Sequence, residues 1–159
     1  MLASNVRPHS GDLLDHYRLQ SIVSTSVRAD VFRAIDTRTS KQVAIKVPHL
    51  EIEGDPAMYD RFYREEEIET KLDHPGVVKI FPNPDRSKTY VVMEWIEGKL
   101  LSQILKEEKR LPVDRATKLT LHICDALGYV HGHGVVLRDL SPESIMVDSD
   151  DNVKLFGFG

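Results

Sequence analysis

Residues 137–144 read Leu-Arg-Asp-Leu-Ser-Pro-Glu-Ser, and this polar stretch lies between two short apolar pieces at 135–136 and 145–147. If both pieces form strands, the stretch between them is a loop with fixed ends, and an acidic side chain in it is positioned rather than free. Asp139 has this position, and we take it as the candidate general base, with Arg138 beside it.

A second landmark is a lysine inside an apolar strand. Residues 43–47 read Val-Ala-Ile-Lys-Val, and the helical pattern that follows over 56–72 contains Glu65. Taken alone, Lys46 could be an edge residue with its amine in water, and Glu65 one more solvated acid. Taken in order, a strand lysine and a glutamate on the next helix can pair, and the pair would direct the ammonium group at phosphate oxygens.

The chain divides by pattern into a loose lead-in at 1–16, a strand-rich lobe at 17–95 and a helix-rich part at 96–159. Alternating and β-branched runs predict five strands in the strand-rich lobe. They lie at 17–23, 30–34, 43–47, 77–81 and 89–93. Apolar spacings of three and four predict later helices at 100–108 and 114–131, followed by short apolar pieces at 135–136, 145–147 and 153–156.

Composition sets the class of protein and its surroundings. The 159 residues are 41% hydrophobic and 29% charged, which is typical of a globular protein with a core. The formal charge of −4 gives no general reason to expect binding to nucleic acid or to an anionic membrane. The N-terminal residues lack the pattern of a secretion signal, no run is long enough to span a membrane, and we expect a cytoplasmic location. The single cysteine, Cys124, is expected to be a buried, inert thiol on the apolar side of a helix.

These landmarks, in this order, resemble the protein kinases, and they look most like a bacterial-type serine/threonine kinase domain over residues 17–159. Residues 43–46 match the third-strand lysine motif, Glu65 matches the helix-C glutamate, and 91–98 is similar to the fifth strand and hinge. The resemblance implies an α+β kinase-like fold, with a five-stranded antiparallel small lobe carrying one helix and an incomplete helical large lobe. It also implies ATP as cofactor, Met93 as gatekeeper, and a set of nucleotide-site positions. These are Lys46, Glu65, Val31, Ala44, Met93, Glu94, Ile96 and Met146.

The phosphate-binding loop departs from the family. The motif G-x-G-x-x-G-x-V corresponds to residues 24–31, where Ser24, Ser26 and Ala29 replace the three glycines. Glycine lets backbone N–H groups approach phosphate without a Cβ in the way. Either the hydroxyls of Ser24, Thr25 and Ser26 donate to phosphate instead, or the segment is an ordinary polar hairpin turn.

The catalytic loop departs as well. Leu137 replaces the family's histidine, Ser141 its lysine, Ser144 its magnesium-binding asparagine, and Gly157 the aspartate of D-F-G. Both protein ligands of magnesium are therefore missing, which argues against a bound metal.

Three functional hypotheses follow. The leading one is a truncated pseudokinase that works as a binding or regulatory module, with weak or metal-independent nucleotide binding. The second is an atypical ATP-dependent serine/threonine kinase with Asp139 as base, and the third is a kinase remnant without a specific role. In all three, Lys46 and Glu65 either bind a nucleotide or form a structural ion pair.

The long helix supplies the partner prediction. In the kinase family this helix is covered by later helices, and this sequence ends at residue 159 before them. An apolar stripe left uncovered would bind a protein partner or a second copy of the chain. The stripe is Leu119, Ile123, Leu127 and Val130.

Overall fold

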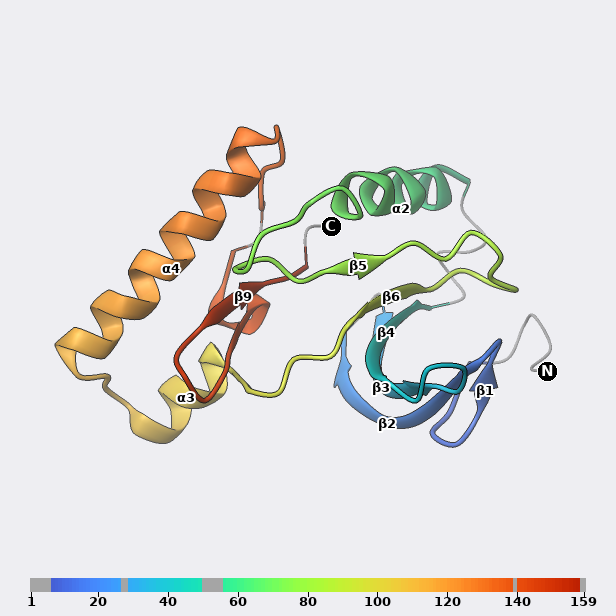
Figure 1. Cartoon of the computed structure of the whole chain (residues 1–159), viewed down its shortest axis with the longest axis horizontal. Helices are drawn as coiled ribbons and strands as arrows, with labels where there is room; N and C mark the ends of the chain where they lie inside the picture. Colours follow the sequence, from blue (N-terminus) through green and yellow to red (C-terminus); the bar gives the residue numbers. More distant parts are fainter. Residues whose placement is uncertain (1–6, 27–28, 50–55, 139, 158–159) are drawn as a thin grey trace. The chain divides into compact units, whose positions relative to one another are not determined.

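The computed structural model describes residues 7–26, 29–49, 56–138 and 140–157, without the side chains of five residues of the helix at 56–69. These five are Met58, Tyr59, Arg61, Phe62 and Glu65. The chain forms two compact units (Figure 1). The first unit comprises Met1–Thr70 with Ile80–Trp95, and the second comprises Lys71–Lys79 with Ile96–Gly159.

In its described residues, the first unit is an antiparallel sheet of six strands with one helix, and its strands follow the order β1-β2-β3-β4-β6-β5. Its elements are β1 (Leu13–Leu14), β2 (Tyr17–Thr25), β3 (Ala29–Asp36), β4 (Gln42–Pro48), α2 (Pro56–Glu69), β5 (Ile80–Phe81) and β6 (Val91–Glu94). Figure 1 shows β2, β3 and β4 as a strongly curved surface. The kinase-like α+β fold is thus present, with one strand more than the sequence predicts.

The extra strand lies in the segment expected to be a loose lead-in. Leu14 is almost fully buried in the core of the first unit, and Leu13–Leu14 pairs with the start of β2. The next residue, Asp15, accepts hydrogen bonds from the Tyr90 hydroxyl at 2.5 Å and from the Ser87 backbone N–H at 3.1 Å. A two-residue strand has no alternation to detect, so tertiary contacts rather than local pattern order this segment.

One face of the sheet forms the core of the first unit. Alternate residues of each strand point to opposite faces, so residues two apart share a face. The core residues are Leu14, Tyr17, Leu19, Phe32, Ala34, Val43, Ile45, Val47, Tyr90 and Val92. The intervening residues of β3 and β4 therefore lie on the opposite face, and these include several of the predicted nucleotide-site positions.

A buried ion pair attaches α2 to the segment before β6. Arg86 donates from both terminal nitrogens to the two carboxylate oxygens of Glu66, at 2.6 and 2.7 Å, and also to the Tyr90 carbonyl at 2.9 Å. The guanidinium lies 4.5 Å from the centre of the Tyr63 ring. Both charged side chains are more than nine-tenths buried, so the bidentate geometry fixes how α2 is rotated within its unit.

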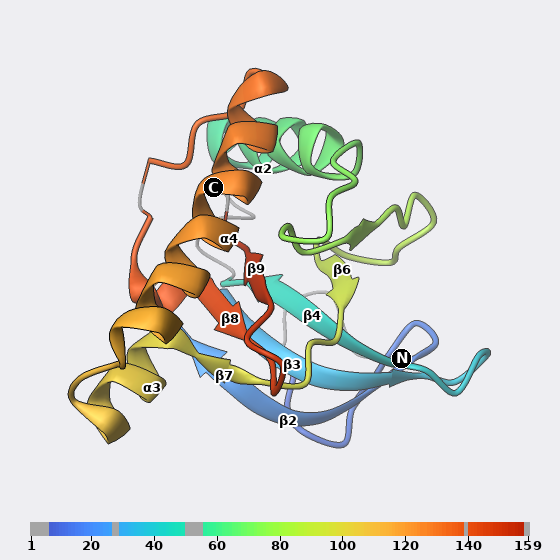
Figure 2. The same cartoon turned by 60° about the vertical axis from the view of Figure 1, so that its left-hand side comes forward.

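The second unit packs a three-stranded antiparallel sheet, β7-β8-β9, against a long helix (Figure 2). Its elements are β7 (Lys99–Leu100), α3 (Leu101–Glu108), α4 (Val113–Gly132), a 3-10 turn (Pro142–Ser144), β8 (Ile145–Val147) and β9 (Val153–Leu155). Residues 76–78 extend this sheet, since Leu155 donates to the Gly76 carbonyl and Val78 donates to the Leu155 carbonyl. A Cβ at Gly76 would lie 2.8 Å from the Ala126 Cβ on α4, so only glycine allows this approach.

Three strand and helix predictions need correction. The strand predicted at 77–81 is confined to Ile80–Phe81, because Val77 instead pairs with Leu155 of the second unit. The helix predicted to run to residue 72 ends at Glu69. The apolar pair at 135–136 forms no strand, and Val136 is exposed. Short apolar pairs are therefore weak strand signals when no neighbouring strand edge is available to them.

Two predictions about α4 are wrong. Leu119 and Val130 are buried, and Ile123 and Leu127 pack against the core of the second unit, so the stripe proposed as a partner surface is the helix's own packing face. Cys124 was expected to be buried but is exposed. It shares the outward side of the helix with Leu121, three residues earlier.

Removal of the Glu66 carboxylate tests the buried ion pair. The Glu66→Ala variant leaves the Arg86 guanidinium buried without its counter-ion, which should lower the free energy of unfolding by about 3–5 kcal/mol in denaturant titrations. Asp60→Ala, an exposed acid on the same helix, is the matched control and should change stability by less than about 0.5 kcal/mol. Equal effects of the two variants would show that the pair does not fix α2.

The carboxylate at Asp15 gives a pH prediction. Burial raises its pKa, but hydrogen bonds from Ser87 and Tyr90 outweigh burial and hold the pKa below its ordinary value. The ionised form therefore contributes stability above about pH 4, the ordinary aspartate range, and this contribution is lost as the pH falls through the lowered pKa. The stability difference between the wild type and Asp15→Asn should stay constant from pH 7 to 5 and shrink below pH 4. A difference that grows on acidification would contradict this assignment, and Asp85→Asn, on the exposed turn nearby, is the control.

Candidate functional site

Four of the predicted nucleotide-site residues share one face of the sheet in the first unit. Val31 pairs with Lys46 across β3 and β4, and Ala44 pairs with Met93 across β4 and β6. Directly opposed residues of antiparallel strands have their side chains on the same face. The other face carries the core, so these four form an apolar platform with a single ammonium group, a surface suited to a purine ring and an anionic group.

Three other predicted nucleotide-site residues, Glu94, Ile96 and Glu65, do not belong to this platform as far as the structure describes them. Glu94 ends β6 and pairs with Val43, while Ile96 begins the second unit, and both are partly buried. The side chain of Glu65 lies outside the described residues. The pairing of Lys46 with Glu65 therefore stays a prediction.

In the loop that replaces the glycine-rich motif, the described donors of Ser26 and Ala29 are bonded to each other's residues. The Ser26 hydroxyl donates to the Ala29 carbonyl and accepts from the Ala29 N–H, both at 3.0 Å, and the Ser26 N–H also donates to that carbonyl at 2.9 Å. Thr25 contributes to lowering the pKa of the neighbouring Asp30 carboxylate. Residues 27–28 lie outside the described part. These contacts are those of a polar hairpin turn, the second of the two alternatives raised by the sequence.

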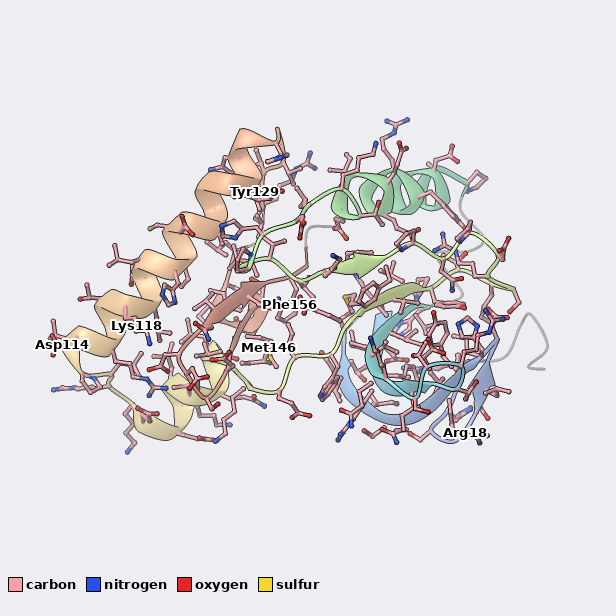
Figure 3. The ribbon with its side chains drawn as sticks, in the orientation of Figure 1. Arg18, Asp114, Lys118, Tyr129, Met146 and Phe156 are labelled. Carbon is pink, nitrogen blue, oxygen red and sulfur yellow. The ribbon has the colours of Figure 1, made fainter. Side chains whose placement is uncertain are left out.

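The catalytic-loop positions belong to the second unit. Leu137 packs against its apolar core, Arg138 is exposed, and Met146 on β8 is partly buried (Figure 3). Asp139, the candidate base, lies outside the described residues. The loop that contains it is held at its far end by the 3-10 turn and β8.

The two positions where kinases hold magnesium are neighbours in this fold. A Cβ at Gly157 would lie 4.0 Å from the Ser144 Cβ, and the Phe156 N–H donates to the Ser144 carbonyl at 3.1 Å. The Ser144 hydroxyl is already used: it donates to the Ser141 carbonyl at 2.9 Å and accepts from the Ser141 N–H at 3.1 Å. Glycine offers no side-chain oxygen, so these positions supply no free oxygen ligand and do not fit a magnesium ion.

No further metal ligands compensate for this loss in the described part of the chain, where no three His, Cys, Asp or Glu side chains are grouped to hold an ion. That part also contains no helix of the length and hydropathy needed to cross a bilayer.

Sequence reasoning missed one charged cluster beside the replaced glycine loop. Asp30, on β3, is 2% exposed and accepts two hydrogen bonds from Arg7, at 2.8 and 2.9 Å. His49 Nε2 lies 3.4 Å from the same carboxylate. Burial raises the pKa of Asp30, but hydrogen bonds from Arg7, His49 and Thr25 outweigh it and leave the pKa below its ordinary value. In the sequence, Asp30 is one acidic residue beside a polar loop, which is a weak signal for a buried ion pair. Its partner Arg7 lies 23 residues earlier, so no local pattern connects the two.

Comparisons with known proteins agree with this geometry. The profile of the protein kinase domain family matches residues 18–159. The chain is 32% identical over 152 residues to serine/threonine-protein kinase PknB of Mycolicibacterium smegmatis, and 31% identical over 157 residues to PknB of Mycobacterium leprae. These alignments cover 92% and 96% of this chain but only 24% and 25% of those relatives.

Solved structures show the same fold. The kinase domain of PknI from Mycobacterium tuberculosis superposes with a TM-score of 0.75 at 21% identity, covering 94% of this chain and 62% of that one. The apo form of PpkA-294 superposes with a TM-score of 0.82 at 18% identity, covering 98% and 62%. The chain thus spans about a quarter of the length of these curated relatives and about three-fifths of the solved kinase chains.

The local role of Ser144 can be tested directly. Ser144→Ala removes both hydrogen bonds to Ser141, and we expect a loss of about 1–2 kcal/mol in unfolding free energy, as for loss of a helix cap. Ser149→Ala, an exposed serine of the following turn, is the control. If Ser144→Ala is as stable as the control, the hydroxyl is not committed to the turn.

Proposed function

This chain belongs to the protein kinase domain family, and we propose that it works as a pseudokinase, a kinase-fold module that binds a nucleotide weakly and without metal and does not transfer phosphate efficiently. The observation that carries the proposal is the pair Ser144 and Gly157. They stand side by side where magnesium would be held, one with its hydroxyl bonded to Ser141 and the other without a side chain.

The loss of metal ligands strikes the main catalytic contribution. Phosphoryl transfer depends on positioning and on neutralising charge as it develops on the phosphoryl oxygens, and magnesium supplies much of that neutralisation. Removal of one preorganised group costs about 10²–10³ in rate in other enzymes. Asp139, retained in the sequence, would then be a base without a correctly held phosphoryl group.

Nucleotide binding is supported by the face of the first unit's sheet that lies opposite its core, where Val31 and Lys46 are partly buried and Ala44 and Met93 are about nine-tenths buried. Val31, Ala44 and Met93 would contact the base, and Lys46 would contact phosphate as a point charge. ATP supplies an adenine for the apolar platform and anionic oxygens for the ammonium. Since the Ser26 hydroxyl and the N–H groups of Ser26 and Ala29 are bonded to one another's residues, these donors would add little to binding, and the platform and Lys46 would supply the main described contacts.

A second candidate is an ATP-dependent serine/threonine kinase of unusual mechanism. It is favoured by the retained Arg138–Asp139 pair and by the relatives, which are named serine/threonine kinases. The regulatory role in the leading proposal implies a protein partner or a second copy of the chain, for which Ile123 and Leu127 of α4 remain partly exposed.

Thermal unfolding with ATP, ADP or no nucleotide, each in magnesium and in chelator, separates the candidates. A ligand that binds only the folded state raises stability by RT ln(1 + [L]/Kd), about 2.7 kcal/mol at 100 Kd. We expect ATP to raise the unfolding temperature equally with magnesium and with chelator. The Lys46→Ala variant should lose the shift, whereas Lys41→Ala, an exposed lysine of the same unit, should keep it.

A shift that requires magnesium, together with phosphate transfer that Asp139→Asn abolishes, would replace the pseudokinase by the enzyme. The double variant Ser144→Asn/Gly157→Asp adds the missing amide and carboxylate oxygens at neighbouring positions. Under the proposal it should make the ATP-induced shift depend on magnesium, although the positive φ of 80° at Gly157 will lower its stability.

A further inference from the structure

The Asp30 cluster joins three segments of the first unit that are distant in sequence. Arg7 comes from the segment before β1, Asp30 from the start of β3, and His49 from the residue after β4. Arg7 donates through Nε and Nη2 to the two oxygens of one carboxylate, the geometry of a strong charge-assisted pair. The Asp30 side chain is 2% exposed and that of Arg7 is 54% exposed. A buried carboxylate is thus held by a cation that reaches it from the surface.

On its other side, Asp30 holds the ends of β2 and β3 together. Thr25 is directly opposite Asp30 in the β2–β3 pairing and contributes to lowering the pKa of its carboxylate. The neighbouring pair, Ser26 and Ala29, exchanges the three hydrogen bonds described above. The Ser26 hydroxyl and the N–H groups of Ser26 and Ala29 are therefore bonded within the protein.

Arg7 acts on this hairpin from the side away from the nucleotide platform. Asp30 shares a face of β3 with the core residues Phe32 and Ala34, whereas Val31 shares the opposite face with Lys46. Arg7 is consequently not placed to bind a nucleotide phosphate itself. Its effect on a nucleotide must pass through Asp30 and the strand ends.

We propose that Asp30 and Arg7 are positioning residues that keep the ends of β2 and β3 paired, so that the donors of Ser26 and Ala29 stay bonded within the protein and are withheld from nucleotide phosphates. The effect on nucleotide phosphates rests on the proposed function, nucleotide binding. The pairing of the strand ends by Arg7 and Asp30 does not depend on it. The proposal accounts for residues with side chains at the three glycine positions, because side-chain and ion-pair contacts hold this turn, which then does not act as a backbone cradle for phosphate. It also gives the segment before β1 a role in ligand selectivity.

The first experiment measures amide hydrogen exchange of the whole chain. In Arg7→Ala, the amides of Ser26 and Ala29 should exchange about tenfold faster than in the wild type, while core amides such as those of Ile45 and Val92 stay protected. Arg18→Ala removes an exposed arginine of the same unit, on β2 (Figure 3), and should leave these amides unchanged. Unchanged exchange at Ser26 and Ala29 in Arg7→Ala would overturn the proposal.

The second experiment compares the affinities of ATP and adenosine. Donors that are freed in Arg7→Ala can bond ATP phosphates but have no partner on adenosine. Arg7→Ala should therefore raise the ratio of ATP affinity to adenosine affinity about threefold to tenfold, the change in affinity expected from roughly one net hydrogen bond. Asp30→Asn should shift the ratio in the same direction, and adding Arg7→Ala to it should have no further effect. Arg7→Lys should shift it less than Arg7→Ala. A ratio that is unchanged or lower in Arg7→Ala would show a purely structural role and overturn the proposal.

The two experiments also separate this proposal from the proposed function. If the wild type binds neither ATP, ADP nor adenosine, nucleotide binding is wrong, and the exchange rates at Ser26 and Ala29 alone decide whether Arg7 positions the strand ends. If the wild type binds ATP and these rates do not respond to Arg7→Ala, the proposed function stands and the positioning role fails.

Discussion

The two-residue alternation of the antiparallel sheet governs the first unit. One face must bury its apolar side chains, and this requirement sets which residues face the other way. Lys46 and Met93 share the face opposite the core because Ile45 and Val92 are in the core. A one-residue slip of β4 would turn the Lys46 ammonium group toward the core and Ile45 away from it. The platform is therefore a consequence of core packing and does not depend on the residues of the loop at 137–144.

Hydrogen-bonded carboxylates join distant segments and fix what the sheet leaves free. Arg86 holds α2 through Glu66, Tyr90 and Ser87 hold the segment before β2 through Asp15, and Arg7 holds the start of β3. The buried carboxylates of Glu66 and Asp30 would be costly without their donors, so they make the local arrangement specific. These contacts are concentrated around the curved sheet, where backbone pairing alone would permit small shifts of α2 and of the strand ends.

Much of this architecture could be predicted from the sequence, because strands with alternating residues and a helix with clear apolar spacing leave strong local signals. The positions of β2, β3, β4 and α4 follow from such patterns, and the family was evident from the order of the motifs around Lys46 and Asp139. Other features could not be read in this way. The pairing of Val77 with Leu155, the buried stripe of α4 and the exposure of Cys124 depend on which neighbours the chain brings together. The ion pair between Arg7 and Asp30 has no local signature at all.

The Ser144 hydroxyl is used within its own turn, at the position where the kinase family has an asparagine. An asparagine that binds magnesium must keep its side-chain oxygen available, and this leaves the surrounding turn without that donor or acceptor. Serine is short enough to turn back on Ser141, and the hydroxyl satisfies two backbone groups at the start of the 3-10 turn. The neighbouring Gly157 adopts a positive φ that glycine tolerates without strain. Both replacements thus favour local stability at the positions where a catalyst would require exposed oxygen ligands, and this is the opposite of the strain usually stored at active sites.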